Sequence, residues 1–171
     1  TAAHCRHYAM CKIDYLGTGS CASGAEKVFV AYYPQGRMDL CHALAEGRIS
    51  LTPALVDAAR NCDLCGACDI QCHFVTGLRP LAVMKALKEH VEGLIAAGVP
   101  VEGSPEDEPL RRLRAIVGAQ WATNDPAVRL TYADDPFPLA GPKTPAYVVL
   151  PGSRDEVAAV VKLADGLGLS M

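Results

Sequence analysis

The feature that most constrains this chain is a run of four cysteines confined to residues 62–72. They follow the spacing C-x2-C-x2-C-x3-C, and they are Cys62, Cys65, Cys68 and Cys72. Two-residue gaps let a looping backbone place three thiolates around one small object, while the fourth sulfur points away from it. A [4Fe–4S] cube needs this geometry, and in two-cluster proteins the fourth cysteine ligates the other cluster. The motif therefore predicts one or two [4Fe–4S] clusters.

A structural zinc site is the alternative for the same cysteines. Zinc favours paired C-x2-C knuckles separated by a longer loop, and ligands this dense suit its tetrahedral shell poorly. A disulfide framework fits less well, because such scaffolds are usually short and secreted. This chain has 171 residues and places half of its eight cysteines in the one run. We expect free thiols in a reducing compartment, the cytoplasm.

The N-terminal residues repeat the spacing imperfectly. Cys5, Tyr8, Cys11 and Tyr15 stand at the same intervals as the four cysteines of 62–72, so two of the four positions lack a thiol. Cys21 follows a Gly-Thr-Gly-Ser run at 17–20 and has the place of a displaced fourth cysteine. The repeat indicates a second cluster site.

The exchanged-ligand rule predicts how the sulfurs divide between two clusters. Cys21 shares a cluster with the first three cysteines of 62–72, whereas Cys72 joins Cys5 and Cys11 and leaves one corner of the second cluster open. Two alternatives stay open: Cys21 joins Cys72 at the N-terminal site, or the chain holds a single cluster and the N-terminal site is lost.

Three residues are candidates for the open corner. Cys41 brings the number of thiols to eight, as two cubes need, but a lone cysteine in a helical segment such as MDLCHALAEG is more often a small core residue. His4 and His7 flank Cys5, and imidazole replaces thiolate in some clusters. Each histidine alone is more typical of a polar neighbour or a surface group.

Composition and charge exclude several classes of function. The net charge of −3 gives no reason to expect a nucleic-acid partner. No apolar run approaches the ~18 residues of a membrane span. No Ser/His/Asp arrangement or paired-carboxylate signature is present, so we expect this segment alone to be non-catalytic.

Periodicity and capping signals predict a largely helical chain. We expect helices at 38–46, at 53–60 with Thr52 as cap, and at 79–98 with an apolar stripe. Residues 99–109 are expected to be a linker, a further helix runs from Leu110 to Gly118, and residues 131–145 are expected to be extended.

The last residues predict one strand followed by one helix. Residues 147–150 are apolar and β-rich, and Ser153 with Glu156 forms a capping box for a helix that Gly168 ends. One such unit buries neither its strand edges nor its helix face, and it needs parallel neighbours reached by crossovers. We therefore expect the chain to be the front part of a longer protein.

Two stretches resemble known families. Residues 34–47 (PQGRMDLCHALAEG), followed by 62–72, resemble the iron–sulfur module of glycolate oxidase and related dehydrogenase subunits, with Gln35 in place of an arginine and the first cysteine motif eroded. Residues 110–171, with LRRLRAIVG, DPAVRLTYADD and PAYVVLPGSRDEVAAVVKLADGLGLSM, resemble the start of a flavoprotein of the vanillyl-alcohol oxidase (PCMH) type.

The resemblance implies an α+β protein. It consists of a mostly helical, ferredoxin-like dicluster domain at 1–98, a linker at 99–109, and the first βα unit of a PCMH-type FAD-binding domain at 110–171. The resemblance also implies a function, that of the iron–sulfur portion of an FAD-linked 2-hydroxy-acid dehydrogenase, which passes electrons between the flavin and an external acceptor. FAD belongs to the complete protein, and the expected partner is a flavin domain or a flavoprotein subunit. The alternatives are a ferredoxin-like adaptor that docks a separate flavoprotein, and a zinc-stabilised interaction module.

Overall fold

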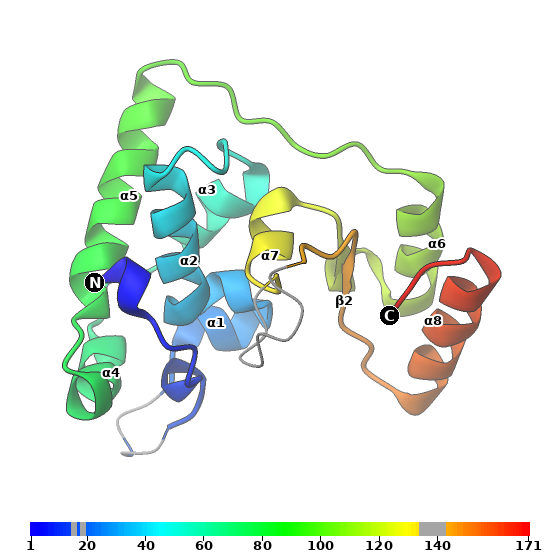
Figure 1. The fold of residues 1–171 in the computed structure, drawn as a ribbon, viewed down its shortest axis with the longest axis horizontal. Coiled ribbons are helices and arrows are strands. Elements are labelled where there is room, and N and C mark those ends of the chain that lie inside the picture. The colour runs from blue at the N-terminus through cyan, green and yellow to red at the C-terminus, as the bar shows by residue number, and fades with distance from the viewer. Residues whose placement is uncertain (15–16, 18–19, 134–142) are drawn as a thin grey trace.

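The computed structural model describes residues 1–14, 17, 20–133 and 143–171, and it is mostly helical (Figure 1). Within these ranges there are eight α-helices and one small two-stranded antiparallel sheet. Tyr15, two residues of the Gly-Thr-Gly-Ser run and most of the stretch predicted to be extended at 131–145 lie outside the described residues.

The N-terminal part is built from helices alone. Its α-helices are α1 (Ala22–Lys27), α2 (Pro34–Ala45), α3 (Pro53–Arg60), α4 (Ala67–Thr76) and α5 (Pro80–Ala96). Short 3₁₀ turns precede them or lie between them: η1 (Ala2–His4), η2 (Met10–Lys12) and η3 (Val30–Tyr32). Figure 1 shows α5 along one side of the molecule with α2 beside it, and α2 and α5 are in contact.

The helices start where proline and capping signals allow. The helix α3 has the predicted bounds, and the side chain of its cap Thr52 accepts a hydrogen bond from the Leu55 N–H. The helix α2 begins at Pro34 and not at the predicted 38, because proline is tolerated in a first helical turn, where its missing N–H has no partner. Gly36 lets this turn approach η3 closely, since a Cβ atom there would lie 2.2 Å from the Val30 carbonyl oxygen.

The largest apolar core lies between α2, α3, α5 and η3. The helix predicted at 79–98 is α5, and it directs Leu87 and Val91 of its predicted apolar stripe into this core. Leu40 of α2 and Leu55 of α3 are fully buried against them. This core fixes the helices that surround the cysteines.

The C-terminal part contains the sheet and a second, smaller core. Its elements are α6 (Glu108–Val117), the 3₁₀ turn η4 (Ala119–Trp121), β1 (Ala122–Thr123), α7 (Pro126–Leu130), β2 (Val148–Val149) and α8 (Arg154–Gly166). The helix predicted after the linker is α6, and Leu110, Leu113 and Val117 bury its apolar face. The strand predicted at 147–150 is β2, and it pairs with β1 in the antiparallel direction, Ala122 opposite Val149. A parallel neighbour for β2 stays a prediction.

The helix α7 is absent from the sequence-based expectations, although its signals are present. Asp125 caps it by accepting from the Ala127 N–H at 2.8 Å, and Pro126 takes the first helical position. Ala127 and Val128 pack into the core of the N-terminal helices. This contact joins residues on both sides of the predicted linker, and the division into 1–98 and 110–171 stays a prediction.

The cap of α8 follows the predicted pair of residues. Ser153 accepts from the Glu156 N–H at 3.2 Å, while the Glu156 carboxylate accepts from the Gly152 N–H at 2.7 Å. Val157 and Val161 of the predicted apolar stripe are exposed, whereas Leu163 and Ala164 are buried. The helix ends at Gly166, two residues before Gly168.

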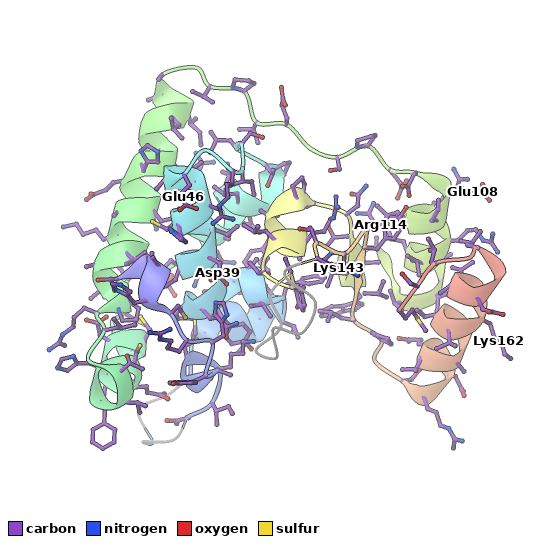
Figure 2. All side chains as sticks on the ribbon, viewed as in Figure 1. Asp39, Glu46, Glu108, Arg114, Lys143 and Lys162 are labelled. Atoms are coloured by element: carbon purple, nitrogen blue, oxygen red, sulfur yellow. The ribbon has the colours of Figure 1, made fainter. Side chains whose placement is uncertain are left out.

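Charged side chains of both signs are spread over the surface (Figure 2). Arg114 of α6 donates to the Glu106 carboxylate at 2.7 Å and to the Ala122 carbonyl at 3.1 Å, so it ties the segment before α6 to β1. Across the described ranges, no helix combines the length and the apolar character that crossing a bilayer requires.

Candidate metal centres

The cysteines of 62–72 divide between two neighbouring pockets. The first, named here the Cys68 pocket, contains four thiols and has an empty volume of about 400 Å³ including the solvent at its mouth. Its cysteines are Cys21, Cys62, Cys65 and Cys68. The second, named the Cys72 pocket, has an empty volume of about 420 Å³ on the same measure. Its cysteines are Cys5, Cys11 and Cys72.

The helix α4 connects the two pockets. Cys68 and Cys72 lie on it one turn apart, and each contributes its thiol to a different pocket. Pro34, at the start of α2, lines both pockets and forms part of the wall between them. The structure thus brings the sulfurs together in the grouping that the exchanged-ligand rule predicts. Whether they bind clusters stays a prediction.

Backbone turns and two anchoring bonds shape the loop 62–68. Leu64 and Gly66 have φ values of 56° and 82°, in the left-handed region, and α4 starts at the next residue. The Lys88 ammonium of α5 donates to the Cys62 carbonyl at 2.9 Å. The Asp69 carboxylate of α4 accepts from the Leu81 N–H at 2.6 Å, which joins the start of α4 to the start of α5.

A buried arginine lies in the Cys68 pocket. Arg37 of α2 is only 1% exposed. Its guanidinium donates to the Ala58 carbonyl at 2.7 Å, to the Ser23 hydroxyl at 2.7 Å and to Cys21 Sγ at 3.6 Å. None of these acceptors is a carboxylate, so a full positive charge is buried beside a thiol. A buried charge needs a counter-charge, and an anionic group bound in this pocket would supply one.

Burial keeps several thiols protonated in the free chain. It raises the pKa of Cys68 to about 12, with Asp69 and Cys62 adding smaller contributions. Burial also raises the pKa of Cys11 to about 11, which the backbone N–H of Gln35 partly offsets, and raises the pKa of Cys5. Because metals and clusters bind thiolates, loading must release these protons.

The residues present fit iron–sulfur clusters. Thiolates are the ligands that clusters use, and backbone N–H groups directed at sulfur stabilise the negative charge of the core. Gln35 supplies such a group to Cys11, and His7 supplies one to Cys5. The Thr76 hydroxyl lies 3.1 Å from Cys72 Sγ. All eight cysteines are free, and among the described residues no set of three or more His, Cys, Asp or Glu side chains is placed to hold a single metal ion.

The candidates for the open corner lie in three different places. Cys41 of α2 is half-buried, packs against the apolar core and stands outside the lining of both pockets. His7 lines the Cys72 pocket, and its Nε2 atom is 2.8 Å from Asp39 Oδ1. His4 is exposed and stands outside both linings.

Sequence reasoning missed Arg37. The signal was an arginine between Gly36 and Met38, in a helix whose next residues are mostly apolar.

Compared with protein-family models, with curated proteins and with solved structures, the chain matches none of them.

Proposed function

We propose that the chain binds two iron–sulfur clusters, one in each pocket, and passes single electrons as the iron–sulfur portion of an FAD-linked oxidoreductase. The observation that carries this proposal is the position of α4, which contributes Cys68 to one pocket and Cys72 to the other. Two-cluster ferredoxins exchange a ligand in this way.

The chain's own groups suit one-electron transfer. A bound cluster stores one electron with little change in geometry. Arg37 and the backbone N–H groups of Gln35 and His7 lie at Cys21, Cys11 and Cys5, where they would stabilise negative charge added to a bound cluster. Pro34 lines both pockets, so the two pockets are neighbours.

The flavin enters through the resemblance of residues 110–171 to the start of a PCMH-type domain. In the complete oxidoreductase, bound FAD would supply the chemistry of accepting a hydride from a 2-hydroxy acid and of releasing electrons singly. No residue of this chain is assigned to the flavin. The proposed partners are a flavin domain or flavoprotein subunit and an external electron acceptor, in the cytoplasm, where thiols stay reduced.

Two other functions make use of the same thiols. A ferredoxin-like adaptor that docks a separate flavoprotein uses both clusters in the same way and differs only in where the flavin resides. A zinc-stabilised interaction module uses the cysteines structurally and carries no electrons.

The decisive measurement is acid-labile sulfide on anaerobically purified chain, with iron and zinc measured on the same sample. Two clusters give about eight sulfides per chain, and one cluster gives about four. Zinc without sulfide overturns the redox proposal. Cys68→Ser and Cys72→Ser are each expected to lower the sulfide content, whereas Cys41→Ala, as the matched control, leaves it unchanged.

Electron transfer is tested on the chain with its clusters bound. Free FAD, reduced beforehand by light, serves as the electron donor. The visible absorbance of the clusters is expected to bleach when reduced FAD is added and to return with ferricyanide. Absorbance that does not respond to either reagent leaves the clusters structural and contradicts the electron-transfer function.

A further inference from the structure

The two cysteine loops share one backbone pattern. In the loop 62–68 the residues with positive φ are Leu64 (56°) and Gly66 (82°), and they flank Cys65. In the loop 5–11 they are His7 (54°) and Ala9 (60°). These residues stand at the same two positions after the first cysteine of each loop, so the N-terminal loop repeats the turns of the intact motif.

The repeat continues into the helices that follow. Gly66 in left-handed conformation precedes α4, and Ala9 in the same conformation precedes η2, which starts at the equivalent position. Left-handed backbone is uncommon outside glycine and is strained for a residue such as Ala9. The N-terminal loop thus keeps the path of a cluster-binding loop despite that strain.

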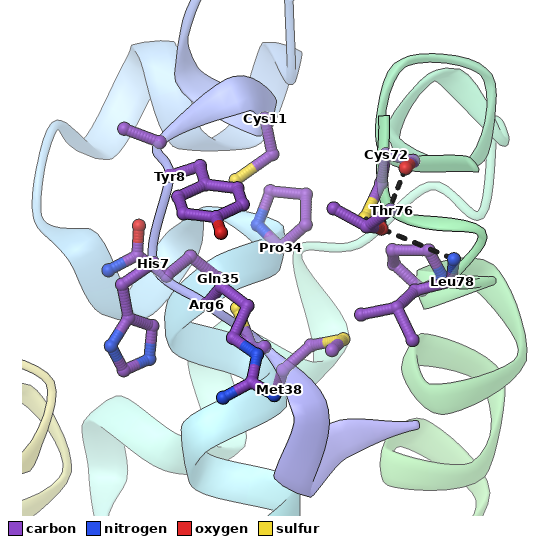
Figure 3. Close-up of a pocket in the computed structure, with 13 residues that line it drawn as sticks. Arg6, His7, Tyr8, Cys11, Pro34, Gln35, Met38, Cys72, Thr76 and Leu78 are labelled. Carbon is purple, nitrogen blue, oxygen red and sulfur yellow. Dashed lines mark hydrogen bonds between the residues drawn. The ribbon is translucent and has the colours of Figure 1, made fainter. Parts of the chain in front are cut away.

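This alignment places Tyr8 where Cys65 stands in the other loop. Tyr8 lines the Cys72 pocket, and Figure 3 shows its ring beside Cys11 with Cys72 on the opposite wall. The pocket therefore has three thiols and, at the fourth ligand position, a phenol. Tyr8 is 62% exposed, so this side of the pocket is open to solvent.

Neither Cys41 nor His4 lies at that corner. Cys41 packs against the apolar core, and His4 lies outside the pocket lining. His7 reaches the pocket, but its Nε2 atom is engaged with Asp39 at 2.8 Å.

We propose that the cluster in the Cys72 pocket has three protein thiolates and an exchangeable fourth iron beside Tyr8, so that the oxidised chain carries a [3Fe–4S] cluster there. This inference rests on the proposed function. The interconversion is [4Fe–4S]²⁺ → [3Fe–4S]⁺ + Fe²⁺ + e⁻, with the electron taken by an outer-sphere oxidant such as ferricyanide. Four thiolates hold every iron in the Cys68 pocket, so that site keeps its [4Fe–4S] cluster.

The test compares iron with sulfide and records electron paramagnetic resonance on the chain oxidised with ferricyanide. The unmodified chain is expected to give about seven iron and about eight sulfides, with the near-isotropic signal of [3Fe–4S]⁺. Adding Fe²⁺ with dithionite is expected to abolish that signal. Tyr8→Cys restores the missing thiol, so it is expected to hold about eight iron and to lose the signal.

Two further variants separate the possible fourth ligands. Tyr8→Phe is expected to have the same iron content as the unmodified chain, because the phenol is not required. If the variant loses an iron that the unmodified chain retains, the phenolate is a ligand and the proposal is overturned. Cys41→Ala is expected to change nothing, and loss of iron there makes Cys41 the fourth ligand.

The two proposals fail in different ways. If the chain holds about eight sulfides and about eight iron, and ferricyanide removes none of the iron, the proposal of an exchangeable iron is overturned. The two-cluster function is then left intact. Absence of sulfide overturns both.

Discussion

The Nη1 atom of Arg37 lies 3.6 Å from the Sγ atom of Cys21, inside the Cys68 pocket. The same guanidinium is held by the Ala58 carbonyl and the Ser23 hydroxyl, each at 2.7 Å, so its position does not depend on the thiol. A fixed and buried cation next to a proposed ligand favours any state in which the pocket gains negative charge.

Arg37→Gln is expected to lower the reduction potential of the cluster in the Cys68 pocket. Reduction adds one negative charge, and a unit charge about 6 Å away at an effective dielectric constant of about 20 contributes about 3 kcal/mol, or on the order of 100 mV. A redox titration followed by electron paramagnetic resonance measures the shift. Arg37→Lys keeps the charge and should retain most of the potential, and Arg48→Gln removes an exposed charge as a control.

The metal-free chain is expected to lose stability at high pH through Cys11. Burial raises the pKa of Cys11 in the folded state to about 11, above the usual 9.0, so folding favours the neutral thiol. That contribution is fully present below pH 9 and is lost as the pH rises through about 11, by about 3 kcal/mol in total. Urea unfolding under reducing conditions measures it. Cys11→Ala should flatten this decline, and an unchanged slope would contradict the assignment.

Asp125→Ala is expected to destabilise the chain by about 3 kcal/mol. The buried carboxylate accepts from the Thr52 hydroxyl at 2.7 Å, from the Ala54 N–H at 3.1 Å and from the Ala127 N–H at 2.8 Å, so it joins the starts of α3 and α7. Asp107→Ala removes the cap of α6, where the carboxylate is exposed, and should cost only about 1 kcal/mol. Equal losses in urea unfolding would refute the role of burial.

Gly36→Ala is expected to prevent normal packing of α2. A Cβ atom at this position would lie 2.2 Å from the Val30 carbonyl oxygen and 2.6 Å from Ala31 Cα, both of them backbone atoms. We expect a loss of about 3 kcal/mol or more, together with a lower sulfide content, because α2 carries Arg37 and Pro34 into the pockets. Gly93→Ala in α5 has open space around it and should stabilise the chain by about 1 kcal/mol.

Local signals account for the helices and loops that the sequence predicted well. Thr52 and Pro53 mark the start of α3, and the apolar period of α5 and the cap of α8 are readable without any tertiary contact. The helix α2 starts at Pro34, earlier than the predicted residue 38, because its first turn has almost no apolar periodicity. The position of that turn is determined by the close approach of Gly36 to η3. The helix α7 is short, and it is stabilised by the contact of Asp125 with Thr52, a residue far away in the chain.

The spacing of the cysteines is a property of the sequence alone, and it was enough to predict two groups of thiols and an incomplete fourth position beside Cys5 and Cys11. What the tertiary structure decided is which sulfur lies in which pocket, because that depends on the direction of α4 between Cys68 and Cys72. It also decided that Cys41 packs in the core and that Arg37 is buried beside Cys21. The physical reason is that spacing determines which residues can reach a common centre, whereas burial and the pairing of charge arise only when distant helices pack together.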